Sequence, residues 1–312
     1  MILVTGANGQ IGTVLTEALR NKYGSESVLA TDIKKPEENT GLFEMLDILN
    51  LQRIVEIIHD YKITTIYHLA AILSASGEWN PQKTWNVNLN SFLSILDLSR
   101  TEGIQKIFFP STIAVFGTTT PRVMTPQHTS MIPSTVYGIS KTAGELWCNY
   151  YNNRYELDVR SVRYPGIISY QSMPGGGTTD YAVDIFHHAL QHGHYTCFLE
   201  ADTRLPMMYM DDAIRATLEL MEAPAEKIKI RTSYNLAAMS FTPAELAEEI
   251  KKHIPDFKIE YKPDHRQEIA ASWTESIDDT EARKDWGWNH EYDLATMTFE
   301  MLKQLKKKYT HV

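Results

Sequence analysis

The chain has 312 residues, 43% hydrophobic and 22% charged, a composition that excludes disordered, collagen-like and coiled-coil proteins. Thirty basic residues against 39 acidic ones give a formal net charge of −9, which disfavours binding to nucleic acids or anionic membranes. The two cysteines lack metal-ligand or disulfide-framework spacing, no apolar run could span a bilayer, and no basic leader precedes the first apolar residues, so we expect a cytoplasmic protein without a bound metal.

Short β-branched runs alternate with longer segments of helical hydrophobic spacing through the first half of the chain. This pattern predicts buried strands at residues 2–5, 28–32, 65–69, 107–111 and 159–164, and helices at 13–22, 51–61, 85–101 and 135–154. Such alternation is typical of a parallel sheet covered on both faces, so the predicted fold class is a doubly wound α/β fold.

The alternation breaks after residue 168, where a glycine-rich loop at 174–177 precedes a predicted helix at 181–192. A strand at 233–237 and a helix at 242–253 follow, the helix opening with Thr242 as N-cap and Glu245 completing a capping box. We expect a dinucleotide-binding domain over 1–168, with segments near 207–238 returning to it. Residues 169–312 would mainly form a smaller substrate lobe over the carboxyl edge of the sheet.

Three glycines, Gly6, Gly9 and Gly12, lie at the first predicted strand–helix junction, where the chain must turn sharply and approach a pyrophosphate closely. Asp32 follows 20 residues after Gly12, at the end of the next predicted strand, where a carboxylate accepts hydrogen bonds from the adenosine ribose. A carboxylate repels a 2′-phosphate, and no arginine follows Asp32, although two lysines do. We therefore expect NAD rather than NADP; the alternative is a structural glycine turn with an incidental aspartate.

Tyr137 and Lys141 lie four residues apart on a predicted helix and so share one face of it. An ammonium near a phenol favours the phenolate and lowers its pKa, so such a tyrosine can act as general base toward an alcohol. The pair alone is common on exposed helices. Here it accompanies the glycine turn and two adjacent hydroxyls, Ser111 and Thr112, at the end of a predicted strand, although these hydroxyls could also merely cap that strand.

These features together resemble the short-chain dehydrogenase/reductase superfamily, and best its extended, nucleotide-sugar-epimerase-like branch. Residues 47–48, 68–71, 86–87, 163–166 and 209–213 look like further motifs of that branch, so the resemblance covers nearly the whole chain. It implies that NAD is contacted by Gly6, Asn8, Gly9, Gln10, Ile11, Gly12, Asp32, Ile33, Asp47, Ile48, Leu69, Ala70, Ala71, Asn86, Tyr137, Lys141, Tyr164, Pro165 and Ile167. Thr112 stands where the branch usually carries a catalytic serine, and Ser111 stays open as the neighbouring candidate.

Two stretches, 164–182 and 271–283, look like the short-chain type of bacterial L-threonine 3-dehydrogenase. That family resemblance implies oxidation of the threonine side-chain hydroxyl to 2-amino-3-oxobutanoate with release of NADH. In this hypothesis Tyr137 is the base, Thr112 positions the reacting oxygen, and Lys141 both keeps Tyr137 deprotonated and binds the nicotinamide ribose.

The same resemblance implies a substrate contact for Ser74. Thr178, Thr179 and Asp180 at a predicted helix start would offer N–H donors to a carboxylate, and Asp180 a charge for an ammonium group. Trp273 would cap the pocket. In the alternative reading the first three residues only cap a helix, and Trp273 belongs to the core.

Two other functions stay open. An epimerase or dehydratase of the same branch would need a larger pocket with stacking and basic groups for a nucleotide sugar. A non-enzymatic dinucleotide sensor would have no need of the tyrosine–lysine pair. The resemblance also implies a homodimer through helices at about 85–101 and 135–154, with Leu93, Leu96, Trp147 and Tyr151 as candidate surface residues that could equally pack inward.

Overall fold

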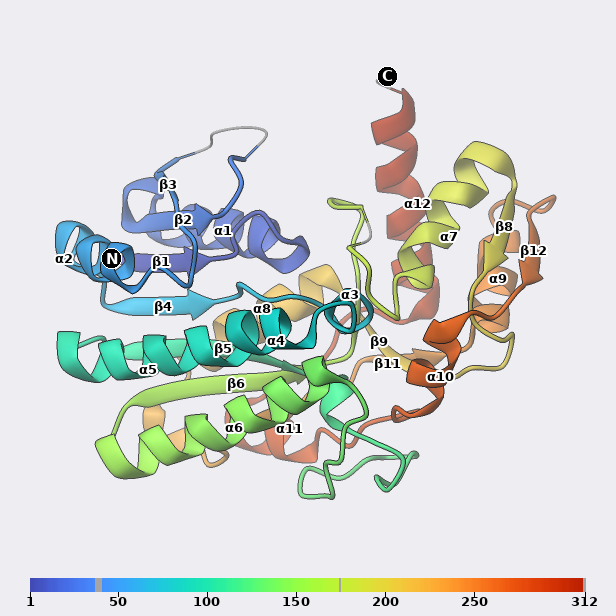
Figure 1. Ribbon diagram of the computed structural model, residues 1–312. Coiled ribbons are helices and arrows are strands. Elements are labelled where there is room, and N and C mark those ends of the chain that lie inside the picture. The colour runs from blue at the N-terminus through green and yellow to red at the C-terminus, as the bar shows by residue number, and fades with distance from the viewer. Residues whose placement is uncertain (37–40, 174, 311–312) are drawn as a thin grey trace.

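Seven parallel strands form the larger sheet of the computed structural model, which describes residues 1–36, 41–173 and 175–310. Their order is β10-β6-β5-β4-β1-β2-β3 (Figure 1). The bounds are β1 (Ile2–Thr5), β2 (Val28–Asp32), β3 (Phe43–Met45), β4 (Thr65–His68), β5 (Lys106–Thr112), β6 (Asp158–Tyr164) and β10 (Tyr234–Asn235). The order reverses between β1 and β4, and ligands of such sheets bind beyond the carboxyl ends at that point.

Helices cover both faces of this sheet, because neighbouring strand residues enter opposite cores. Val4, Tyr67 and Phe108 pack with one set of helices, whereas their neighbours Leu3, Ile66 and Ile107 pack with the other. The first set is α1 (Gln10–Tyr23), α8 (Met210–Glu222) and α11 (Thr280–Trp286); the second is α2 (Leu51–Tyr61), α5 (Ser91–Glu102) and α6 (Val136–Tyr155) (Figure 1). The predicted doubly wound α/β fold is confirmed.

The single helix expected at 85–101 is divided in the structure. A short helix α4 (Pro81–Trp85) runs into a π-helical turn (Asn86–Asn90), and α5 continues from it. The wider turn adds one residue between hydrogen-bonded partners, as in the bond from the Ser91 amide to the Asn86 carbonyl. Such a turn changes which helix face the residues before it present, compared with those after it. Ser91, which follows the turn, bonds His68 at the carboxyl end of β4, and His68 bonds Thr5 at that of β1.

Two of the four side chains expected on a dimer surface point inward. Leu96 and Tyr151 belong to the core between the sheet and helices α2, α5 and α6, and Leu93 packs partly against that core. Their burial follows from the contact between α5 and α6, which turns these faces toward each other and toward the strands. Trp147 alone of the four is exposed, at 37%.

A smaller lobe lies beyond the carboxyl ends of the large sheet (Figure 1). Its strands are β7 (Gly166–Ile168), β9 (Leu205–Tyr209) and β11 (Met239–Phe241) in one sheet and β8 (His194–Cys197) with β12 (Lys258–Tyr261) in another. Its helices are α7 (Tyr181–His192), α9 (Pro243–Lys251), α10 (His265–Ala271) and α12 (Leu294–Thr310), and a four-residue helix α3 (Ser74–Gly77) follows β4. These elements surround a third core, and the capping box predicted for α9 is confirmed.

The division of the chain into two domains remains a proposal. Helix α8 and strand β10, from the stretch expected to return, lie on the large sheet, and so does α11 from nearer the C-terminus. Across the described ranges, no helix is both long and apolar enough to cross a membrane.

Candidate active site

The turn between β1 and α1 is built from positions where a side chain does not fit. A Cβ on Gly6, whose φ is 67°, would lie 2.7 Å from the Ala70 amide nitrogen, and one on Gly12 would lie 2.2 Å from the Gly6 carbonyl oxygen. Helix α1 begins at Gln10, with Gly9 as N-cap, no capping side chain and no acidic residue in its first turn. The amides at this helix start are therefore suited to an anion such as a pyrophosphate.

Asp32 lies beside this turn at the end of β2. Its carboxylate accepts hydrogen bonds from the Asn8 amide (3.0 Å) and the Lys34 amide (3.1 Å), and the Asn8 side chain donates to the Lys34 carbonyl (2.6 Å). Both carboxylate oxygens keep further lone pairs, so ribose hydroxyls can still bind. The neighbouring Ile33 is 63% exposed. These residues fit an adenosine without a 2′-phosphate.

Other expected cofactor contacts surround the same turn. Leu69, Ala70 and Ala71 follow β4 directly, and the Ala70 amide donates to the Thr5 hydroxyl (3.4 Å). Beyond β3, Ile48 is buried whereas Asp47 is exposed and accepts from the Leu49 amide. Ile11 packs partly against the α1–α8 core.

Two further cofactor candidates, Gln10 and Ile167, are joined by a hydrogen bond. The Gln10 side chain donates to the Ile167 carbonyl (3.3 Å), so it joins the start of α1 to β7. Pro165 is buried between β6 and β7. The Tyr164 hydroxyl bonds the Thr217 hydroxyl on α8, which leaves only the backbone of Tyr164 to approach a cofactor.

Asn86 is not brought to this group. Its side chain is exposed and accepts a hydrogen bond from Asn90, on the outer side of the π-helical turn. Asn88, which the sequence analysis did not single out, is buried instead, and its amide bonds both the nitrogen (2.8 Å) and the oxygen (2.9 Å) of Ile72. The uneven spacing of a π turn hides such a residue from a pattern that assumes regular helical periodicity.

Tyr137, Thr112 and Lys141 meet where β5 ends and α6 begins. Thr112 shares a hydrogen bond with the Tyr137 hydroxyl. The Lys141 ammonium is buried, donates to the Pro110 carbonyl (2.8 Å), and lies 5.8 Å from the centre of the Tyr137 ring and 4.5 Å from that of Phe109. A phenol, an orienting hydroxyl and an amine thus converge on one point.

Burial acts on the two titratable groups in opposite directions, because it disfavours the charged form of each. It raises the pKa of Tyr137 to about 12, partly offset by the hydrogen bond with Thr112. It lowers the pKa of Lys141 to about 7. At neutral pH the phenol therefore keeps its proton while the amine is near its midpoint, so the phenolate–ammonium form is the minor one of the two that contain a single proton.

The structure separates the two candidate hydroxyls. Ser111 is buried, and its hydroxyl donates to Glu145 (2.5 Å) on α6, away from Tyr137. Thr112, as the next residue of an extended strand, points to the other side, toward Tyr137. Thr112 is thus placed to orient a substrate oxygen.

Two expected substrate residues are in contact. The hydroxyls of Ser74, at the start of α3, and Thr178, just before α7, lie 3.3 Å apart, and both residues are buried. Thr179 packs on β7: a Cβ on Gly166 would lie 2.7 Å from its methyl group. Segments about one hundred residues apart thus contribute hydroxyls to one polar spot.

Asp180 is engaged by the glycine-rich loop in front of it. Its carboxylate accepts from the amides of Gly176 (2.8 Å) and Gly177 (2.7 Å), and the φ of Gly176, 93°, suits only glycine. The carboxylate expected for an ammonium group is therefore already hydrogen-bonded at Oδ2, and neither of these two amides bonds Oδ1. Pro174 of this loop lies outside the described residues.

Trp273 is 5% exposed and belongs to the core of the smaller lobe, against which the Tyr137 ring also packs. Its segment is joined to residues 122–134 by hydrogen bonds. The hydroxyls of Ser272 and Ser134 lie 3.2 Å apart, the Thr274 hydroxyl bonds that of Thr125, and Glu275 pairs with Arg122. Trp273 thus belongs to the core, as in the alternative reading, and its role as a cap of the pocket stays a prediction.

Glu145 and Arg163 are a buried ion pair directly beneath the site, and sequence reasoning had assigned neither a role. One signal was available. Glu145 follows Tyr137 and Lys141 at the same four-residue spacing, which places its side chain on the same face of the helix as theirs. In the part of the chain that the structure describes, no three His, Cys, Asp or Glu residues are grouped so as to hold a metal ion.

A parallel sheet in this strand order, with a glycine turn suited to an anion, a carboxylate at the end of the next strand and a tyrosine–lysine pair at its carboxyl edge, is typical of dinucleotide-dependent enzymes. The sequence model of the NAD dependent epimerase/dehydratase family matches residues 2–237. The chain belongs to this family, and NAD is its cofactor.

Three relatives are similar over almost the whole chain. A GalE-like L-threonine dehydrogenase from Cupriavidus necator, solved in its holo form, is 53% identical with a TM-score of 0.96 and covers 97% of this chain and 99% of that one. A monomeric L-threonine 3-dehydrogenase from a metagenome is 50% identical with a TM-score of 0.96 over 99% of each chain. A mitochondrial L-threonine 3-dehydrogenase from Bos taurus is 49% identical, covering 96% of this chain and 81% of that protein.

Proposed function

We propose that this protein oxidises the side-chain hydroxyl of L-threonine to give 2-amino-3-oxobutanoate and NADH. The observation that carries the proposal is the contact between α3, whose Ser74 hydroxyl lies 3.3 Å from that of Thr178, and α6, which holds Tyr137 and Lys141. The chain is also about half identical to L-threonine dehydrogenases along its length. The polar spot would bind the charged end of the amino acid, and Thr112 and Tyr137 would receive the hydroxyl.

The reaction removes a proton from the substrate hydroxyl and a hydride from the carbon that bears it. The Tyr137 oxygen takes the proton of the substrate hydroxyl while Thr112 donates a hydrogen bond to the same oxygen and fixes its direction. Lys141, as the ammonium, stabilises the phenolate that this requires. NAD, held by the glycine turn and Asp32, supplies the hydride acceptor for the same carbon.

A nucleotide-sugar reaction is disfavoured by the packing on the substrate side. The hydrogen bonds between residues 122–134 and 272–276 bring these two segments together, and Trp273 and the Tyr137 ring pack into the same core. A nucleotide would need room and basic groups there. An amino acid needs only a small pocket with polar groups for its two charges.

Absorbance of NADH tests the proposal. Purified protein with NAD and L-threonine should form NADH steadily, with much slower rates when L-allo-threonine replaces the substrate or NADP replaces the cofactor. A nucleotide sugar serves as the opposing substrate, because an epimerase converts it without net NADH. No NADH from threonine alongside conversion of the nucleotide sugar would overturn the proposal.

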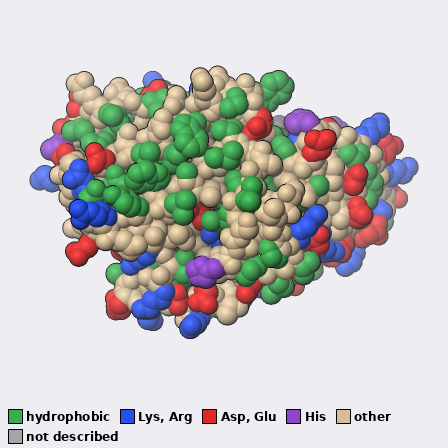
Figure 2. All heavy atoms as spheres, turned by 60° about the horizontal axis from the view of Figure 1, so that its bottom comes forward, with side chains coloured by type: hydrophobic (Ala, Val, Ile, Leu, Met, Phe, Trp, Pro, Cys, Tyr) green, Lys and Arg blue, Asp and Glu red, His purple; other side chains and the backbone are tan. Residues whose placement is uncertain are grey.

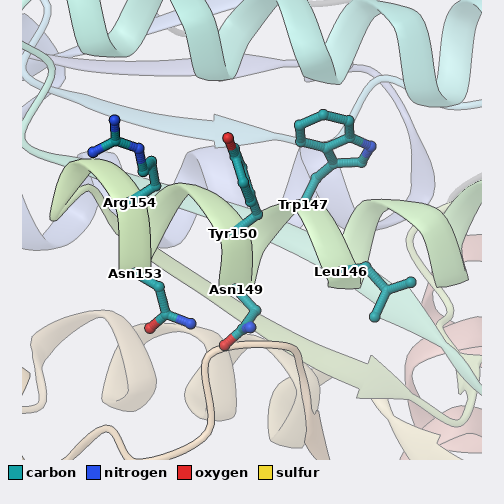
Figure 3. A pocket seen from close by; sticks show the side chains of 6 residues that line it. All are labelled: Leu146, Trp147, Asn149, Tyr150, Asn153 and Arg154. Atoms are coloured by element: carbon teal, nitrogen blue, oxygen red, sulfur yellow. The ribbon is translucent and has the colours of Figure 1, made fainter.

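We also propose that the outer face of α6 is the contact surface of a homodimer. Leu146, Trp147 and Tyr150 are 37–58% exposed around a surface hollow of about 560 Å³, with Trp147 and Tyr150 projecting to one side of the helix (Figure 3). Hydrophobic side chains gather over the left and middle of the face in Figure 2, whereas charged ones crowd the smaller lobe at right. Apolar patches of this kind mark interaction sites.

Light scattering tests this surface, since one similar dehydrogenase is described as monomeric. The wild type should have the mass of a dimer, and Trp147→Glu/Tyr150→Lys should have that of a monomer with an unchanged circular dichroism spectrum. A monomeric wild type would overturn the dimer proposal and leave the catalytic proposal intact.

The two free, buried cysteines support a reducing compartment, and we propose that the protein is located in the cytoplasm.

A further inference from the structure

Glu145 on α6 and Arg163 on β6 form a buried ion pair between the helix and the strand on which it packs; Figure 1 shows these two elements side by side. The Glu145 side chain is fully buried and that of Arg163 is 3% exposed. The arginine binds the carboxylate in a fork, with Nε to Oε1 at 2.9 Å and Nη2 to Oε2 at 2.7 Å. Such geometry fixes direction as well as distance.

On the side of the catalytic helix, the pair controls which hydroxyl reaches the site. Oε1 of Glu145 also accepts the Ser111 hydroxyl proton at 2.5 Å. Ser111 is therefore held against α6 at the level of Glu145, whereas Thr112 meets Tyr137. Glu145 itself lies two turns along α6 from Tyr137, on the same buried face.

On the opposite side, the pair reaches the segment that carries Trp273. Nη1 of Arg163 donates to the Gln127 carbonyl and to the Asn235 side chain, both at 3.0 Å. The Asn235 amide donates in turn to the Thr125 carbonyl (3.1 Å), and the Thr125 hydroxyl bonds that of Thr274. A continuous set of buried hydrogen bonds thus joins the base-carrying helix to the residue next to Trp273.

A buried ion pair is a poor source of stability, because desolvation of the charges offsets their attraction, and apolar side chains of similar size often serve as well. We propose that Glu145 and Arg163 are positioning residues for the reaction. They hold the Ser111 hydroxyl away from the site, so that only Thr112 meets Tyr137. They also fix the position of α6 relative to the segment that carries Trp273. This inference rests on the proposed threonine oxidation.

The chain offers a matched control on the same strand. Arg160 lies at the opposite end of β6, its side chain is 1% exposed, and it binds Asp158 in the same forked manner, at 3.0 and 2.8 Å. Its further bonds go to carbonyls of residues 220 and 223, far from the site. Glu145→Gln and Asp158→Asn each leave a buried arginine without its carboxylate, and Asp158→Asn also removes the partner of Arg231.

The experiment measures Tm, the Kd for NAD, and kcat and KM for L-threonine, in both variants, below their Tm. The Tm of both variants should be lower than that of the wild type. Only in Glu145→Gln should kcat fall, by about 10²-fold, which is the usual effect of displacing the reacting groups by 1 Å. The Kd for NAD should not change. Asp158→Asn should keep the wild-type kcat.

A second variant separates positioning from stability. Glu145→Gln/Arg163→Gln contains no unpaired buried charge, so its Tm should recover above that of the single variant while kcat stays low. Recovery of kcat together with Tm, or equal kcat losses in Glu145→Gln and Asp158→Asn, would overturn the inference. Failure of the threonine proposal can be distinguished from failure of this inference, because in the first case the wild type itself would form no NADH.

Discussion

Tyr137 and Lys141 titrate as a pair rather than as separate residues. With pKa values moved by burial to about 12 for Tyr137 and about 7 for Lys141, the first proton leaves the pair near pH 7. The state with one proton left is mainly the phenol with the neutral amine, and its minor form, the phenolate with the ammonium, is the one that can accept a proton from an alcohol. The doubly protonated state below pH 7 contains no base.

The pH dependence of kcat/KM for L-threonine follows from this pair. The value should rise with pH through a midpoint near 7, the pKa of Lys141, and then stay level. In Lys141→Met the base is the phenol alone, so the rise should move toward its pKa of about 12. A profile measured in both proteins checks this, and an unchanged rise in the variant would contradict it.

The two neighbouring hydroxyls of β5 should differ in what their loss affects. Thr112→Ala removes the hydrogen bond to the reacting oxygen and should lower kcat by about 10²–10³-fold. Ser111→Ala removes one hydrogen bond from buried Glu145, which should cost about 1–3 kcal/mol of unfolding free energy and a smaller loss of kcat. Steady-state rates and denaturant unfolding measure both, and the reverse ranking in kcat would assign the role to Ser111.

Among the elements, the π-helical turn at Asn86–Asn90 has the clearest effect on the site. It directs Asn88 inward, where both ends of its amide bond the backbone of Ile72, two residues before Ser74. The irregular segment between β4 and α3 has few backbone partners of its own. Asn88 therefore supports the segment that presents the Ser74 hydroxyl.

Asn88→Ala should loosen that segment. Two backbone groups of Ile72 lose their partner, so we expect a loss of about 1–3 kcal/mol in unfolding free energy and a rise of roughly tenfold in KM for L-threonine. Asn90→Ala, on the exposed side of the same turn, is the control and should change neither value appreciably. An unchanged KM in Asn88→Ala would show that Ser74 needs no such support.

The elements themselves were largely predictable, because buried parallel strands and amphipathic helices have different periods of hydrophobicity. The π turn was not, since one added residue breaks the helical period without leaving a glycine or proline. Nor was the bonding of Asp180: whether its carboxylate meets a ligand or the amides of Gly176 and Gly177 depends on a loop geometry that composition does not encode.

At the scale of the whole molecule, the site lies between the large sheet and the smaller lobe. The glycine turn and Asp32 are local motifs that their spacing predicts, whereas the tyrosine–lysine pair has meaning only together with the motifs around it. The contacts that complete the site, Ser74 with Thr178 and Thr125 with Thr274, join residues more than one hundred positions apart. A single sequence contains no signal for such pairs beyond resemblance to known proteins.

The transfer of deuterium from L-threonine labelled at its hydroxyl-bearing carbon tests the central claim most directly. The NADH produced should contain one deuterium per molecule of 2-amino-3-oxobutanoate formed, and Tyr137→Phe should bind NAD but transfer deuterium about 10²–10⁴-fold more slowly, the usual effect of losing a general base. NADH without deuterium, or near-normal transfer in Tyr137→Phe, would contradict the account.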